Sequence, residues 1–368
     1  MHISKPEIDL PEGTDPYASE VYAKGAENLQ KLINDKVLMR DEKACYYVYR
    51  LVMGEHQQTG LVVSASVADY DTNRIRKHEY TRPDKEDDRV RQIDALNAQT
   101  GPVFLTYRNN KIVEGITGKV SKTTPTYDLT ADDGVKHTIW VVEDDEDINT
   151  LTSTFDAMDC LYIADAHHRS ASASRIAASR NKGNSDTGNA AHDYFLSVIF
   201  PDNQMQILDY NRVIKDLNGL SEDELIEKIK KSFTVEAVDA LYKPQKCTEF
   251  SMCLKGQWYN IQISAELIPE NDPGGALDIS LLQSNLSEAM LGVSDPRRDK
   301  RIDFVGGIRG LGELSKRVDK GEMAVAFALF PVSMNQLMNI ADTGNIMPPK
   351  VTWFEPKLRS GLVINKLN

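Results

Sequence analysis

The feature that most constrains the fold of this chain is a strand-like run followed at once by polar residues and then by a helix-compatible segment. Residues 160–164 are apolar, as in a buried strand, and residues 170–180 are small. Four side chains able to bind or react stand between them: Asp165, His167, His168 and Arg169. Proteins of the α/β class place ligands where a strand ends and a helix begins. The stretch therefore predicts a strand-to-helix turn that carries a site.

Hydrophobic periodicity elsewhere predicts a mixture of helices and hairpins. A helical face over 17–37 is followed by β-branched and aromatic residues at 45–53 and 61–67, which predict a hairpin about a turn at 54–60. We expect other strands at 102–107, at 194–201 paired with 206–213, and at 248–254 paired with 257–263, helices at 90–100 and 278–291, and a flexible loop at 181–189. The fold class is α/β in the mixed α+β sense, with hairpins in a mixed sheet rather than a doubly wound parallel sheet.

The length of 368 residues is typical of two domains, or of two lobes about one cleft. We place the boundary near residue 215, ahead of a capping box formed by Ser221 and Glu224. This predicts an N-terminal lobe over 1–215 that carries the polar cluster, and a C-terminal α+β lobe over 216–368 whose tail returns to the site.

Composition excludes several classes of function. The net charge of −12 argues against a nucleic-acid partner, because coating DNA or RNA needs a basic face, but a local basic pocket can still hold a small anion. Four cysteines without a CxxC pattern are typical of reduced thiols in a cytoplasmic protein. No stretch approaches about 18 apolar residues, and the N-terminus has no signal-peptide core. We expect a cytoplasmic protein without a membrane span that binds a small molecule, and a homodimer is left open.

The polar cluster admits more than one chemistry. Asp165 can orient a hydroxyl or hold Mg²⁺, which takes one or two carboxylates plus phosphate oxygens, or it can cap the helix. On an extended backbone His167 and His168 point to different sides, so they suit phosphate, substrate or backbone contacts rather than one shared metal. Zinc is not favoured, because no third His or Cys stands at a suitable spacing. Arg169 matches two phosphate oxygens, with an ion pair as the alternative.

Two later stretches carry cations on a constrained backbone. Residues 306–312 are glycine-dense without the pattern of a P-loop, and they present Arg309 either on a tight turn or toward a phosphate. The prolines in Met347-Pro-Pro-Lys350 fix the backbone, so Lys350, together with Thr352, is a candidate phosphate ligand. The alternative for this stretch is a terminal segment packed on the core through its aromatic residues.

The motif Asp165-Ala-His-His-Arg169 resembles the Asp-Gly-His-His-Arg signature of a widespread bacterial family, the domain of unknown function 1015. Recurrent blocks of that family match in order along nearly the whole chain: Lys77-His-Glu79, Arg82-Pro-Asp84 with Arg89, Pro102-Val-Phe104, and Met347-Pro-Pro-Lys350 through Gly361-Leu-Val363. The sequence departs at Ala166, where Gly is usual, and at Ser170, where an aromatic is common. Ala166 matters if that position requires φ > 0 or a close approach to phosphate.

The signature is also similar to one in the ParB/sulfiredoxin superfamily, which includes free-serine kinases that use ADP or ATP. The resemblance implies a ParB/sulfiredoxin-like core in which the motif handles nucleotide phosphates, with Mg²⁺ as companion ion. It implies that Glu79, as general base, and Asp165 activate an acceptor hydroxyl. Through their own positive charge, His78 and Arg82, with Lys85 and Arg89, can attract an anion to the same segment. Without the resemblance, the charged segment 69–89 is equally well a solvated loop or a mobile lid.

These observations favour a nucleotide-dependent phosphotransferase that acts on a small hydroxylated metabolite, with free serine as the specific candidate. Two alternatives remain open. One is a nucleotide-binding regulatory module of ParB type without turnover, and the other is a phosphoester hydrolase that uses the two histidines.

Overall fold

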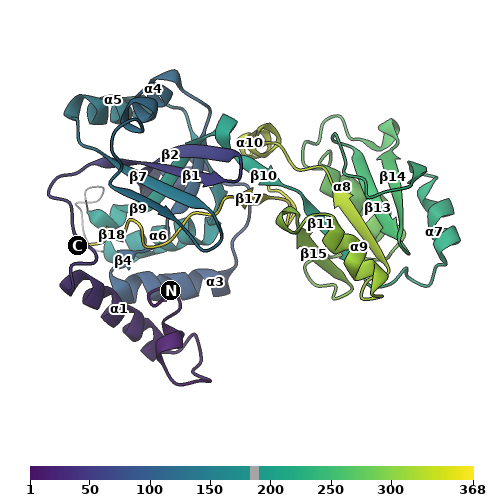
Figure 1. Ribbon diagram of the computed structural model, residues 1–368, viewed down its shortest axis with the longest axis horizontal. Coiled ribbons are helices and arrows are strands. Elements are labelled where there is room, and N and C mark those ends of the chain that lie inside the picture. The colour runs from purple at the N-terminus through teal and green to yellow at the C-terminus, as the bar shows by residue number, and fades with distance from the viewer. Residues whose placement is uncertain (183–189) are drawn as a thin grey trace. The chain divides into compact units, whose positions relative to one another are not determined.

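The structure, a computed structural model, describes residues 1–182 and 190–368 and divides into two compact units (Figure 1). Unit 1 comprises residues 1–205 and 356–368, and unit 2 comprises residues 206–355. Both units combine helices with sheets, so the predicted mixed α/β class is confirmed. The division falls after Met205 rather than near 215, because the strands that follow pair within unit 2.

Unit 1 is built on an eight-stranded mixed sheet. Its strand order is β3 (Ile75–Arg76), β8 (Leu161–Asp165), β5 (Val103–Tyr107), β9 (Tyr194–Pro201), β2 (His56–Ser66), β1 (Tyr46–Met53), β7 (Lys136–Val142) and β6 (Tyr127–Thr130). The pairs β3/β8 and β5/β9 are parallel, and the other neighbours are antiparallel. All of β5 is buried, including Thr106, as its largely apolar sequence predicts for a strand covered on both faces.

Helices and short elements complete unit 1. The helices are α1 (Ser19–Asn34), α2 (Val67–Asp71), α3 (Pro83–Leu96), α4 (Lys111–Val120), α5 (Asp145–Asp156) and α6 (His167–Arg180), with 3-10 turns at Pro6–Asp9, Ala191–Asp193 and Asp202–Gln204. Near the end of the chain, β18 (Asn365–Lys366) pairs with β4 (Ala98–Gln99). The main core joins Leu105, Ile163 and Phe195 of the central strands to Leu151 of α5.

Unit 2 is built on a six-stranded antiparallel sheet. Its strand order is β12 (Phe233–Val238), β14 (Gln257–Ile263), β13 (Glu249–Leu254), β16 (Val325–Leu329), β11 (Tyr210–Ile214) and β15 (Ile302–Gly306). A separate pair joins β10 (Gln206–Leu208) to β17 (Trp353–Glu355). The helices are α7 (Glu222–Ile229), α8 (Asp278–Leu282) with a π-helical turn at Gln283–Glu288, α9 (Gly312–Asp319) and α10 (Met334–Asp342), with 3-10 turns at Ala265–Leu267 and Gly307–Arg309.

Several expectations from the sequence are confirmed and others are wrong. The capping box of Ser221 and Glu224 starts α7, and the hairpin of β13 and β14 forms as predicted. The first hairpin turns immediately after Met53, because Gly54 adopts φ +59°, so β2 begins at His56 rather than at 61. The strands after residue 205 do not pair with β9.

Two helices begin earlier in the chain than the sequence predicts. The charged segment expected to be a loop or lid is partly helical, since α3 begins at Pro83, whose fixed φ suits a first helical turn. The helix expected from residue 170 begins at His167, so the motif itself forms its first turn. Residues 183–189 of the loop expected at 181–189 lie outside the described residues.

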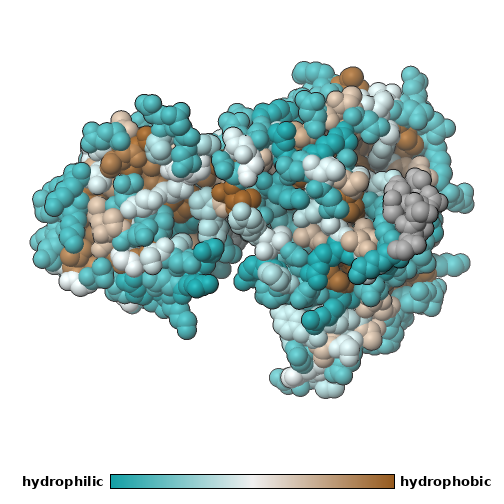
Figure 2. All heavy atoms as spheres, turned by 180° about the vertical axis from the view of Figure 1, so that it is seen from behind, coloured by the Kyte–Doolittle hydropathy of each residue, from teal (hydrophilic) through white to brown (hydrophobic). Residues whose placement is uncertain are grey.

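On the face drawn in Figure 2, hydrophilic side chains cover most of the molecule, and hydrophobic ones appear in small separate groups. Among the residues that the structure describes, none of the helices is long and apolar enough to cross a membrane.

Candidate functional site

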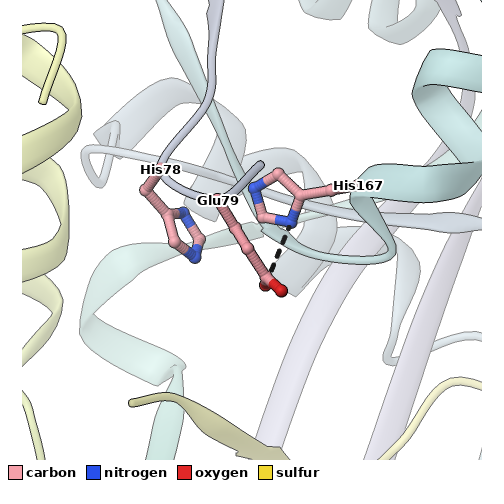
Figure 3. Close-up of side chains that lie close together, drawn as sticks. All are labelled: His78, Glu79 and His167. Atoms are coloured by element: carbon pink, nitrogen blue, oxygen red, sulfur yellow. Dashed lines mark ion pairs between the residues drawn. The ribbon is translucent and has the colours of Figure 1, made fainter. Parts of the chain in front are cut away.

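The site begins with the parallel pairing of β3 and β8. Ile75 lies opposite Leu161, and the chain leaves both strands at the same edge of the sheet. The loop after β3 therefore meets the turn after β8, although more than eighty positions separate them in the sequence. The ring of His78 lies 4.5 Å from that of His167, measured between centroids, and Nδ1 of His167 lies 3.9 Å from a carboxylate oxygen of Glu79 (Figure 3).

The turn between β8 and α6 has an unusual backbone. Ala166 adopts φ 75° and ψ 35°, the left-handed conformation that favours glycine, so this position does require φ > 0. Its amide donates to Oδ1 of Asp165 at 2.6 Å. Asp165 therefore satisfies the amide of the N-cap residue, whereas among the described residues no side chain caps the amides further into the first turn of α6. The amino end of α6 is thus suited to an anion.

Asp165 is paired with a lysine from the end of the chain. Nζ of Lys357 lies 2.6 Å from Oδ2, and the two side chains are 50% and 43% exposed. Burial acts to raise the pKa of Asp165, but the charge and hydrogen bond of Lys357, helped by the amide of Ala166, hold the pKa below its ordinary value. Asp165 is therefore a carboxylate at neutral pH. Sequence reasoning missed Lys357, because it stands beyond the proline-stiffened stretch that drew attention to the tail.

The imidazoles of His78 and His167 are buried, unlike side chains that bind a phosphate from solvent. His78 is 1% exposed and His167 is 4% exposed. Burial lowers the pKa of His78 to about 4, against weaker opposing effects of the Ile163 backbone and the charge of Asp165. Burial also lowers the pKa of His167 well below its ordinary value, and the neighbouring imidazole of His78 adds to the effect. Both rings are therefore neutral near pH 7.

His168 and Arg169 take up other positions on the first turn of α6. Nε2 of His168 accepts a hydrogen bond from the backbone amide of Arg82 at 3.0 Å, which ties α6 to the start of α3. Burial lowers the pKa of His168, with the positive charge of Arg82 as the next cause. The half-buried guanidinium of Arg169 donates to the carbonyl oxygen of Pro102 at 2.7 Å. It packs so closely on Gly101 that a Cβ there would lie 2.8 Å from Cζ.

Within residues 1–182 and 190–368, one group of side chains has the arrangement of a metal site. His78, Glu79 and His167 each offer a ligand atom, and the three atoms lie within 4.8 Å of one another. The sequence argument against zinc considered only His and Cys as third ligands. It therefore missed a carboxylate that reaches the histidines from a neighbouring loop.

Residues 1–280 match the model of a family described as "Protein of unknown function (DUF1015)". The chain belongs to this family. The matched segment contains the β3 loop and the strand-to-helix turn, so the site of this DUF1015 protein lies within it. No curated protein matches the chain.

Solved structures similar to this DUF1015 protein are distant. A free serine kinase in complex with AMP is 13% identical, with a TM-score of 0.37, over 80% of this chain and 86% of that chain. SbnI with a C-terminal truncation from Staphylococcus aureus is 10% identical, with a TM-score of 0.43, over 81% and 84%. A conserved hypothetical protein from Pyrococcus furiosus is 16% identical, with a TM-score of 0.39, over 84% and 95%.

The candidate residues of this DUF1015 protein divide between the two units. The structure brings together seven in unit 1: His78, Glu79, Arg82, Asp165, His167, His168 and Arg169. Arg309, Lys350 and Thr352 belong to unit 2, beyond the matched segment. Arg309 is exposed on a 3-10 turn, and Lys350 adopts φ 60° with its ammonium 5.7 Å from the ring centroid of Tyr210.

Proposed function

We propose that this protein is a nucleotide-dependent phosphotransferase that acts on a small hydroxylated metabolite, on a ParB/sulfiredoxin-like core. The observation that carries the proposal is the convergence of Glu79 with the turn after Asp165. Two carboxylates, the uncapped amino end of a helix and several cations gather at one edge of the sheet. Phosphoryl transfer to an alcohol needs this combination, because it depends on positioning and on stabilising charge.

Each group has a proposed role. The amides of the first turn of α6, with Arg169 and His168, hold nucleotide phosphates, and Arg82 at the start of α3 adds a further charge. Asp165 orients the acceptor hydroxyl or the Mg²⁺ that accompanies ATP or ADP. Its partner Lys357 is a flexible cation suited to shift toward a transferring phosphate. Three residues of unit 2 remain proposed phosphate ligands: Arg309, Lys350 and Thr352.

Glu79 is the proposed general base. Its side chain is 49% exposed, so an acceptor can reach it, and it lies on the loop that meets the motif. A base must stand within hydrogen-bond reach of the hydroxyl whose proton it accepts. Free serine is the first acceptor to test, because the motif resembles that of free-serine kinases.

The test is turnover of ATP or ADP with Mg²⁺ and free serine by the full chain, with phosphoserine and the nucleotide product both quantified. Glu79→Gln and Asp165→Asn are expected to lower turnover by about 10²–10⁴-fold while nucleotide still shifts the melting temperature. Glu55→Gln, in the exposed turn between β1 and β2, is the matched control and should behave as the wild type. The proposal fails if no nucleotide with Mg²⁺ shifts the melting temperature of the wild-type protein.

A phosphoester hydrolase is the second candidate, favoured by the donor group of His78, Glu79 and His167. Metal-assisted hydrolases use such donors to activate water. Steady release of inorganic phosphate without an acceptor would support this candidate over the phosphotransferase.

A further inference from the structure

We propose that His78, Glu79 and His167 form a binding site for one divalent transition-metal ion, held by two imidazole nitrogens and one carboxylate oxygen. The site is part of the proposed active site, and only the ion's catalytic use, not its binding, rests on the proposed function. Figure 3 shows the Glu79 carboxylate reaching between the two rings, with a nitrogen of each ring on the side that faces it.

The first support is that the imidazole nitrogens are buried without partners. Neither nitrogen of His78 nor Nε2 of His167 has a hydrogen-bond partner of acceptable geometry. The edge-to-face packing of the rings, at 88°, explains their fit but satisfies no nitrogen. A buried polar atom left unsatisfied costs about 1–3 kcal/mol, so native proteins rarely keep such atoms together. Binding one ion would satisfy one of these nitrogens on His78, whereas on His167 the ion would take Nδ1, the nitrogen nearest Glu79.

The second support is the contact between His167 and Glu79. Nδ1 of His167 lies 3.9 Å from a carboxylate oxygen of Glu79, a distance that exceeds that of a hydrogen bond. Two ligands about 2.0–2.2 Å from a tetrahedral Zn²⁺ lie about 3.3–3.6 Å apart. The 3.9 Å between these two atoms is therefore only a few tenths of an ångström too wide for a shared ion. All three ligand atoms lie within 4.8 Å of one another, so binding an ion needs the group to contract, and the half-exposed Glu79 is the member that can move most freely.

The third support is the way the backbone holds the ligands. His78 follows β3 and His167 opens α6 directly after β8, and these two strands are hydrogen-bonded in parallel. The two imidazoles are therefore fixed by the sheet before any ion binds, while Glu79 closes the site from the loop. Three protein ligands with one exposed side leave coordination positions open, as in catalytic rather than structural zinc sites.

The ligand chemistry selects the class of ion. Imidazole suits Zn²⁺, Co²⁺, Ni²⁺ or Fe²⁺, whereas Mg²⁺ prefers oxygen ligands alone. Asp165, the carboxylate first considered for Mg²⁺, already accepts from Lys357 and from the amide of Ala166. Glu79 contributes one oxygen to the ion, so its second oxygen can still accept the proton of an acceptor hydroxyl, as the proposed function requires.

The test is metal binding by the chelator-treated full chain without nucleotide. Titration with Zn²⁺, followed by calorimetry and metal analysis after dialysis, should give one equivalent per chain, unaffected by excess Mg²⁺. Glu79→Gln should bind at least tenfold more weakly, and it keeps the fold testable because the side chain is half-exposed. His2→Gln, which alters an exposed histidine paired with Asp9, should bind as the wild type.

Co²⁺ provides an independent readout. Its visible absorption should indicate nitrogen and oxygen ligands in the wild type and be lost in Glu79→Gln, with circular dichroism confirming that the variant is folded. The inference is overturned by the absence of stoichiometric binding, by unchanged binding in Glu79→Gln, or by a sulfur-to-cobalt charge-transfer band, which would place the ion on a cysteine. The shift of the melting temperature by nucleotide is measured separately, which keeps the two proposals distinct. If the protein binds metal but no nucleotide shifts its melting temperature, only the phosphotransferase proposal is refuted.

Discussion

Replacing Ala166 by glycine is expected to stabilise the protein, although glycine usually weakens the interior of a helix. Ala166 adopts φ 75° and ψ 35° between β8 and α6. This left-handed conformation costs a residue with a Cβ about 1–2 kcal/mol. Glycine removes that cost, while the greater freedom of the unfolded chain offsets about 0.4–1 kcal/mol of the gain. The net expectation is an increase of about 0.5 kcal/mol in the free energy of unfolding.

A second substitution in the same helix supplies the control. Ala178 is exposed in α6, well away from the turn, so glycine there should cost about 1 kcal/mol. The two variants should therefore lie on opposite sides of the wild type, about 1.5 kcal/mol apart. Urea unfolding of the full chain measures the difference, and hydrogen exchange of the α6 amides checks that it is local. If Ala166→Gly destabilises the protein as much as Ala178→Gly does, the strain argument is wrong.

Two further predictions concern charged groups. Replacing Lys357 by glutamine should cost at most about 1 kcal/mol, because its ion pair with Asp165 is half-exposed, and should raise the pKa of Asp165 in an NMR titration. The pKa of Asp165 is lowered in the folded protein, so the ionised Asp165 stabilises the fold fully above the ordinary pKa of 3.8. This stabilisation is lost as the pH falls through the folded pKa, and the loss should disappear from the acid unfolding of the Lys357 variant. Burial raises the pKa of Asp278 from 3.8 to about 6. The protonated Asp278 therefore contributes its full stabilisation below pH 3.8, and this stabilisation is lost as the pH rises through 6. Asp278→Asn should then increase the free energy of unfolding in urea by up to about 3 kcal/mol at pH 8 and change it little at pH 4, and an effect independent of pH would contradict this account.

Local patterns predicted the elements that position the site, because periodicity and capping depend on residues close in the sequence. The apolar run at 160–164 forms β8, and the small residues after it form most of α6. The boundary of α6 was placed too late, because the charged first turn shows no apolar periodicity. The left-handed backbone at Ala166 could be suspected only from the glycine usual in the resembling signature, since alanine itself gives no sign of φ > 0.

The assembly of the site depends on pairing that no local pattern reveals. β3 consists of Ile75 and Arg76 alone, inside a polar segment that we expected to lie outside the core. Two residues are too few to show alternation, yet Ile75 is 1% exposed and its parallel pairing with β8 buries His78. Composition predicts exposure for such a charged segment, but burial is decided by the strand beside it. The metal-like donor group was therefore invisible until the two loops were brought together.

The position of the C-terminal tail also depends on pairing between distant segments. Prolines directed attention to Lys350 and Thr352, which lie in unit 2, whereas the cation beside Asp165 is Lys357. What places Lys357 there is backbone pairing further along: the amide of Gly361 donates to the carbonyl of Thr100, and β18 then pairs with β4. Residues that follow Lys357 in the sequence fix its position, so the residues that precede it do not predict where it lies. Whether a cation meets a carboxylate 192 positions away is therefore decided by where the chain end attaches to the sheet, not by the stiffness of the segment that leads there.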